Sequence, residues 1–308
     1  MLIVDLVLAS GLVVLAWYAV VGGSLFRGIV MFVVFGMVLA LAWAWLGSPD
    51  LAMAEAAIGA GVTGALLMIA YWRLKRINAV EPVDPSPIRS WVAGGVAVLG
   101  TVVVGMIGLA SLEALGGSAE AARMMNAALP ETGLGNPITG VLIFFRNLDT
   151  LLEVAVLLAA YAGARAALGS HRAELPQPPS STPLFDGLVT VVGPLTVVVA
   201  IYLLQAGSQL PGGAFQAGAT LAALAVMLML AGRLTPASEA DLFTKAGLVV
   251  GTLVFCLVGL GALLIDRPLL GVPGTWAVYL IEAAMMVSIA LTLALLFAGA
   301  AALERRRP

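Results

Sequence analysis

Long apolar stretches separated by short polar connections dominate the pattern of the chain. A bilayer core about 30 Å thick is crossed by roughly 20 apolar residues in a helix, and about nine stretches have such a length. The first begins at Met1-Leu-Ile-Val-Asp5, which has neither a basic segment nor a cleavage site and is interpreted as a span rather than a signal peptide. The pattern therefore predicts an all-α, polytopic membrane protein of about nine transmembrane helices. The expected spans are Leu2–Val21, Ile29–Leu46, Leu51–Trp72, Trp91–Leu112, Ile138–Ala164, Leu188–Ala206, Ala214–Ala231, Leu248–Ile265 and Trp276–Leu303.

Basic residues recur in every second connection and predict the orientation. These residues are Arg27, Arg73, Lys75, Arg76, Arg89, Arg165, Arg172, Arg233, Lys245, Arg305, Arg306 and Arg307. The alternate connections are poor in positive charge: Gly47-Ser48-Pro49, Glu113–Glu131, Gly207–Pro211 and Asp266-Arg267. Because cytoplasmic loops carry the excess of Lys and Arg, we expect an N-terminus outside and a cytoplasmic C-terminus in the inner membrane. That orientation requires an odd number of spans.

Composition narrows the classes of function. Of 308 residues, 61% are hydrophobic and only 10% are charged, and the mean hydropathy is +1.07. Cys256 and His171 are the only residues of their types, so disulfides, thiolate metal sites, zinc sites and Ser-His-Asp triads are not expected. No cofactor, nucleotide or nucleic acid is predicted, and the chain is not expected to be an enzyme by itself.

Two proline-rich linkers divide the predicted spans into blocks. Glu81–Pro87 follows the third span, and Leu175–Pro183 follows the fifth. Such segments are typical of tethers between helical units. The sequence thus predicts three modules, at residues 1–80, 81–175 and 176–308, with three, two and four helices.

Ionisable residues inside predicted spans are the candidate functional groups. Each costs roughly 2.5–3.5 kcal/mol at the bilayer centre, so a partner or a water-filled cavity is expected. Asp50 lies nearer the predicted outer surface, where it can also complement a helix dipole. The candidates for an ion or proton path are Asp50, Glu55, Arg146, Asp149, Glu153 and Glu282.

The fifth span carries three of these charges. On a continuous α-helix, Arg146 and Glu153 would lie about 20° apart, with Asp149 within about 60° of both. One base and two acids would then share a polar stripe. An ion pair that fixes helix packing would explain two of the charges, and the remaining carboxylate is expected to bind and release protons.

The third span begins with a strong helix start and continues with small residues. Ser48 as N-cap and Pro49 at the first helical position predict where it begins. Every fourth residue is small, which favours close approach of another helix: Ala52, Ala56, Ala60 and Gly64. Glu55 has no base in its own helix, so its partner must be another helix or water.

Two further features leave alternatives open. The Pro211-Gly212-Gly213 segment is either a tight re-entry turn or part of a cavity lining. Glu282 is either a functional acid or a carboxyl satisfied by a nearby Tyr or Ser.

Three motifs resemble parts of one family. Ser48–Gly61, with Asp50 and Glu55, resembles the C-terminal module of the large Mrp antiporter subunit, which is also a separate subunit of membrane-bound hydrogenases. Phe145–Glu153 resembles the adjoining two-helix element, and Asp186–Gly218 is similar to the four-helix B-type Mrp subunit. Two positions depart from the family pattern, with Ser208 in place of a His and Ala214 in place of a third Gly.

The resemblance implies an accessory subunit of a multisubunit Mrp-type Na+(cation)/H+ antiporter. Its partners would be other membrane subunits and the lipid bilayer, with H+ and Na+ as transported ions. A membrane-arm subunit of a related respiratory or hydrogenase complex and a structural scaffold remain alternatives. An independent secondary transporter would show two matching halves, which the three-two-four organisation lacks.

Overall fold

The computed structural model describes residues 2–21, 23–76, 87–168, 182–237, 242–299 and 302–305. Within these ranges, eight helical segments are long and apolar enough to cross a membrane, and α9 (Ala214–Leu230) is a shorter apolar helix. The predicted all-α, polytopic membrane fold is therefore confirmed. His171, Arg172 and most of each proline-rich linker lie outside the described residues.

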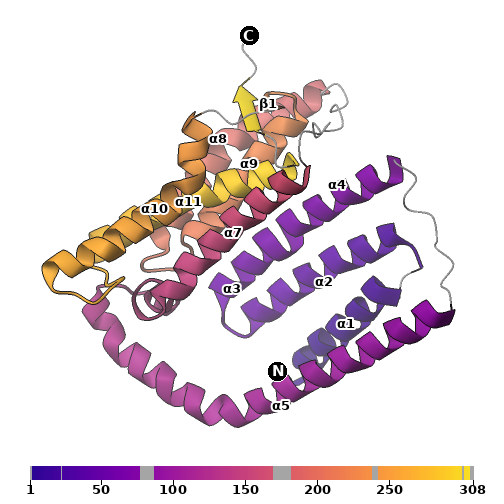
Figure 1. The fold of residues 1–308 in the computed structure, drawn as a ribbon, viewed down its shortest axis with the longest axis horizontal. Helices are drawn as coiled ribbons and strands as arrows, with labels where there is room; N and C mark the ends of the chain where they lie inside the picture. The colour runs from indigo at the N-terminus through magenta and orange to yellow at the C-terminus, as the bar shows by residue number, and fades with distance from the viewer. Residues whose placement is uncertain are drawn as a thin grey trace.

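The first three spans lie side by side at the indigo end of the chain (Figure 1). The second and third spans approach closely, as expected for a small-residue face. A Cβ added to Gly36 would lie only 3.2 Å from the Cβ of Ala60. The third span is not a uniform α-helix, however, and the π-helical spacing of its middle leaves Ala56 exposed while Ala60 is buried. The elements are α1 (Leu2–Val21), α2 (Leu25–Trp45), α3 (Pro49–Ala54), η1 (Glu55–Val62) and α4 (Thr63–Arg76).

The fourth span belongs to a single long helix, α5 (Pro87–Thr132). The acidic stretch Glu113–Glu131, expected as a connection, lies outside the apolar span Gly94–Ser111 and is helical. Its Ala, Leu, Met and Glu residues favour a helix even where the charge rules out the bilayer core. Figure 1 shows α5 bent part-way along and running apart from the other helices for much of its length. Its apolar part, Gly94–Ser111, has no buried residue.

The fifth span is interrupted, contrary to the continuous helix expected from Ile138 to Ala164. It consists of α6 (Pro137–Gly140), the π-helical η2 (Val141–Phe145) and α7 (Asn147–Leu168). Arg146 separates η2 from α7, with φ −132° and ψ 40°, and its N–H donates to the carbonyl of Val141. The 100° spacing assumed for the charged stripe therefore does not apply across Arg146.

Four helices form the C-terminal bundle: α8 (Pro183–Ala206), α9, α10 (Leu242–Gly261) with the 3-10 turn η3 (Ala262–Ile265), and α11 (Thr275–Phe297). The ninth span was expected to reach Leu303, but the helix ends at Phe297. Beyond it, β2 (Ala302–Arg305) pairs antiparallel with β1 (Leu234–Ala237), so a small two-stranded ribbon joins the ends of α9 and α11.

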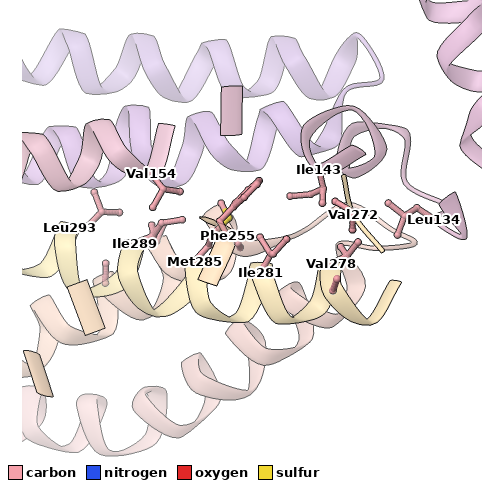
Figure 2. Close-up of a cluster of buried hydrophobic side chains, with 14 residues drawn as sticks. Leu134, Ile143, Val154, Phe255, Val272, Val278, Ile281, Met285, Ile289 and Leu293 are labelled. Carbon is pink, nitrogen blue, oxygen red and sulfur yellow. The ribbon is translucent and has the colours of Figure 1, made fainter. Parts of the chain in front are cut away.

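Helix α11 forms the centre of the molecule. Figure 2 shows its side chains meeting those of α7, α10 and the segments around Leu134 and Val272. Small residues of α9 allow close packing, since a Cβ on Gly218 would lie 2.8 Å from a methyl of Ile289. In α1, by contrast, the structure has no buried residue.

Contacts between helix ends show that the connections lie on two opposite sides of the bundle. On one side, Trp45 Nε1 donates to Asp5 Oδ1 at 2.7 Å, and Asp50 contacts the turn between α8 and α9. On the other, Arg233 Nε lies 3.7 Å from Asp186 Oδ1, close to the β1–β2 ribbon. Alternate connections thus gather on opposite sides, while the identity of the cytoplasmic side stays a prediction.

Candidate functional site

A cavity of about 310 Å³ lies where α3, α6 and α9 begin, against the sides of α7 and α11. Three of the predicted acids line it: Asp50 from α3, Glu153 from α7 and Glu282 from α11. None of the described lining residues is Lys or Arg. Helix N-termini carry partial positive charge and unpaired N–H groups, so this arrangement offers the carboxylates electrostatic support without a basic side chain.

Glu282 is the most deeply placed ionisable group of the cavity, with 4% of its surface exposed. Its carboxylate faces the start of α9, where the backbone amide of Ala214 provides a hydrogen bond. A Cβ on Gly213 would lie 3.1 Å from Oε1, which shows how closely the backbone approaches. Oε2 has no hydrogen-bond partner among the described residues. Among the described residues, therefore, no Tyr or Ser hydroxyl satisfies Oε2.

Asp50 is also buried in the protein, with 6% exposure. Its Oδ1 accepts hydrogen bonds from the backbone N–H of Gly212 at 3.0 Å and from Asn136 Nδ2 at 3.3 Å. Gln216 Nε2 donates to the Asp50 carbonyl oxygen at 3.3 Å. One residue thus connects the third span, the start of α6 and the start of α9.

The turn between α8 and α9 forms one wall of the cavity. Gly212 and Gly213 line it and have φ of 159° and 117°, which side chains rarely adopt. The turn is held by buried Ser208, whose Oγ lies 2.7 Å from the Tyr279 hydroxyl, and by Thr139, which donates to the carbonyl of Gly207. The Pro-Gly-Gly segment is therefore both a tight turn and a cavity lining.

The charged residues of the fifth span differ in whether they line the cavity. Arg146 forms an ion pair with Asp149 at 2.5 Å, and their side chains are 64% and 46% exposed. Glu153 lies one turn further along α7 and contributes to the cavity, although much of its surface is exposed. The break at Arg146 removes the regular spacing from which the polar stripe was inferred, but Asp149 still contacts Arg146 and stays a neighbour of Glu153 on α7.

Glu55 does not line the cavity. It begins the π-helical segment η1, is half-buried, and its carboxylate lies against Gly59, where a Cβ would collide with it. The structure thus places Glu55 on the same span as Asp50 but separates it from the three cavity acids.

Asn136 and Gln216 are site residues that the sequence analysis missed. Asn136 is 3% exposed, caps α6 through the N–H of Ile138, and also donates to the carbonyl of Leu210. An Asn followed by Pro is a recognisable helix start, so its capping role had a local signal. The sequence signal for Gln216 was weaker, because it is only a polar residue among small apolar residues.

Two family models match separate parts of the chain. Residues 10–76 match MbhD, a family of MBH subunits. Residues 184–304 match MnhB, described as a domain related to the MnhB subunit of Na+/H+ antiporter. No curated protein matches the chain in sequence.

Two solved structures are similar in fold. The Mrp complex from Dietzia sp. DQ12-45-1b contains a chain that is 23% identical, with a TM-score of 0.73 and coverage of 95% of this chain and 34% of that one. The membrane-bound sulfane sulfur reductase, an archaeal respiratory membrane complex, contains a chain that is 21% identical, with a TM-score of 0.50 and coverage of 64% and 94%. The present chain thus spans about a third of the Mrp chain that it resembles.

Proposed function

We propose that this chain, an Mrp-type membrane subunit that joins an MbhD-like and an MnhB-like module, is an accessory subunit of a multisubunit cation/proton antiporter. It contributes intramembrane acids to a path for H+ and Na+, and neighbouring membrane subunits complete that path. The complex lies in the inner cell membrane, with the N-terminus of this chain outside and its C-terminus in the cytoplasm. The three modules occupy residues 1–80, 81–175 and 176–308.

The observation that carries this proposal is the cavity with three carboxylates and no basic side chain in its described lining. An uncompensated charge within a membrane protein is costly, so an acid of this cavity whose oxygen lacks a hydrogen-bond partner gains stability by binding a proton or cation. Glu282 suits that role best because one carboxylate oxygen has no partner among the described residues. A packing role would instead favour acids matched to bases, as in the Arg146–Asp149 pair.

Glu55, Arg146 and Asp149 have a different place in this proposal. Each retains exposed surface in the single chain, away from the fully buried groups. We assign them to the contact with neighbouring subunits, where they link the cavity to acids or bases of those subunits. This assignment explains why polar groups occur on membrane-spanning helices without partners in another module of this chain.

A second candidate function is a membrane-arm subunit of an ion-pumping respiratory or hydrogenase complex. The similarity to a chain of the sulfane sulfur reductase supports it, because this chain covers nearly the whole of that one. In that case the same cavity would serve ion movement driven by electron transfer. The two candidates differ in the energy source and not in the site.

The test uses everted membrane vesicles that contain the whole complex. Glu282→Gln keeps the shape of the side chain but cannot ionise, so we expect Na+/H+ exchange to fall by about tenfold or more. Glu120→Gln is the matched control, because Glu120 pairs with Arg123 on an exposed part of α5. A native gel checks that both variants contain the parental amount of complex. Parental exchange by assembled Glu282→Gln would show the proposed role of the cavity to be wrong.

The driving force separates the two candidate functions. Exchange that runs on an imposed pH gradient without an electron donor supports the antiporter, whereas a strict need for a donor supports the respiratory complex. Purified alone in liposomes, the chain should exchange no ions, because the path requires its neighbours. Exchange by the isolated chain would contradict an accessory role.

A further inference from the structure

Asp50 and Glu282 come from different modules but contact the same short turn. Asp50 Oδ1 accepts from the N–H of Gly212, and Glu282 faces the next two residues, Gly213 and Ala214. The two acids are therefore connected by three consecutive backbone units. Any shift of the turn at Gly212 changes where the N-terminus of α9 meets Glu282.

Asp50 supplies the hydrogen bond to the Gly212 N–H, one of several contacts that hold the turn. The carbonyl oxygen of Leu203 accepts from the N–H groups of Gly207 and Gly213, which holds the turn to the end of α8. Gly212 lies between these anchors, and its N–H donates to the Asp50 carboxylate. Asn136 donates to the same Asp50 oxygen and to Leu210, which locks Asp50 against the turn from the other side.

We propose that Asp50 is a positioning residue, whose carboxylate oxygen holds the Gly212 turn and so sets the approach of α9 to Glu282, and that it does not itself carry protons. The inference rests on the proposed role of Glu282 in ion movement. The positioning role requires a hydrogen-bond acceptor at the place of Oδ1, and it does not require Asp50 to gain or lose a proton. A side-chain amide oxygen in the same place meets that requirement, whereas a displaced carboxylate does not.

Two substitutions of Asp50 give opposite results under the two roles. Asp50→Asn keeps an acceptor oxygen at the same distance but cannot titrate. Asp50→Glu keeps a titratable carboxylate but adds a methylene, which moves the oxygen away from Gly212. We expect assembled Asp50→Asn to exchange ions within about twofold of the parental rate, and Asp50→Glu to lose about tenfold. The pH of half-maximal exchange should move in Asp50→Glu and stay in place in Asp50→Asn.

A second measurement follows the turn directly and does not depend on transport. Hydrogen–deuterium exchange of the segment 207–216 is measured in the detergent-solubilised complex. Loss of a hydrogen bond to a charged group should speed exchange in this segment by about tenfold in Asp50→Glu, and Asp50→Asn should leave it near the parental rate. Asp5→Glu is the control, because Asp5 lies on the same side of the bundle and accepts from Trp45, away from the turn.

The outcomes separate the inference from the proposed function. Loss of ion exchange in Asp50→Asn, with full activity in Asp50→Glu, would overturn the positioning role and make Asp50 a proton carrier. Unchanged deuterium exchange in Asp50→Glu would overturn it as well. Parental transport by Glu282→Gln would remove the proposed function of the cavity, and the deuterium measurement would still decide whether Asp50 holds the turn. The remaining titratable groups that line the cavity are Glu153 and Glu282.

Discussion

Two settings for acids differ sharply within this chain. At the cavity, Asp50 and Glu282 are almost fully buried and are supported by backbone N–H groups and an amide side chain. On α7, Asp149 is paired with Arg146, and both side chains are largely exposed in the single chain. The first setting leaves carboxylate oxygens available inside the protein, and the second neutralises a charge at its surface.

The difference teaches how a membrane protein can retain buried acids. A carboxylate near helix N-termini gains from partial positive charge and from N–H donors, so it can be buried without a basic side chain. A carboxylate beside Arg is instead matched by the charge of one side chain, as Asp149 is by Arg146. Charge pairs and buried lone acids on similar spans therefore need not have the same role.

The largest expected effect comes from the wall of the cavity. Gly212→Ala places a Cβ against the carbonyl oxygen of Leu203 at a φ of 159°, so the turn must open. We expect a cost of about 1–3 kcal/mol and a marked loss of assembled complex on a native gel. Gly105→Ala is the control, since nothing lies within 4 Å of its Cβ and Ala favours a helix. Equal amounts of complex in both variants would show that the turn is not constrained.

The sequence predicted the fold well where apolar length decides it. The first span was predicted with the bounds of α1, and the first residue of α9 was also correct. The stretch Glu113–Glu131 was expected only as a connection, and its good helix formers make that connection a continuation of α5. Two family models and the similarity in fold confirm the Mrp-type resemblance that rested on Asp50, Glu55 and the Pro-Gly-Gly segment.

The site was less predictable, for two physical reasons. Asp50 and Gly212 are 162 residues apart, and no local pattern indicates that a carboxylate of one module binds the backbone of another. The grouping of Arg146, Asp149 and Glu153 used a regular α-helix, and the π-helical segment before Arg146 breaks that regularity. Residue types therefore identified candidate acids, while backbone irregularities determined which of them share a cavity.

The second-largest effect is expected from Glu153, and it tests whether this residue acts together with the cavity acids. Glu153→Gln removes a titratable group from the lining, so we expect exchange in vesicles to fall by about tenfold with unchanged complex content. Asp149→Asn lies one turn away on α7 and removes an acid outside the lining. Its effect on the exchange rate should be smaller. If both variants reduce exchange equally, the separation into two settings does not hold for α7.

A smaller effect on complex assembly is expected from the Arg146–Asp149 pair, and removing one partner should cost more than removing both. Arg146→Ala leaves Asp149 without its base, and because that side chain is 46% exposed the cost should stay well below the roughly 2.5–3.5 kcal/mol of a lone charge at the bilayer centre. The double variant Arg146→Ala with Asp149→Asn removes both charges and should assemble better than Arg146→Ala alone. Native gels of the two variants check this order. Poorer assembly of the double variant would show that the pair itself binds a neighbouring subunit.

The last prediction concerns the side of the membrane on which the cavity lies, and its substitutions should leave transport unchanged. The cavity lies on the side where α10 joins α11 and where α3 and α9 begin, and the predicted orientation makes this the outer side. Leu269, 60% exposed in the α10–α11 connection, is replaced by Cys in a Cys256→Ala background, since Cys256 is the only natural cysteine. A membrane-impermeant maleimide should label Leu269→Cys in intact cells. Lys245→Cys, exposed near the start of α10 on the opposite side, should label only after permeabilisation. The reverse pattern would place the cavity on the cytoplasmic side, and protons would then enter the proposed path from there.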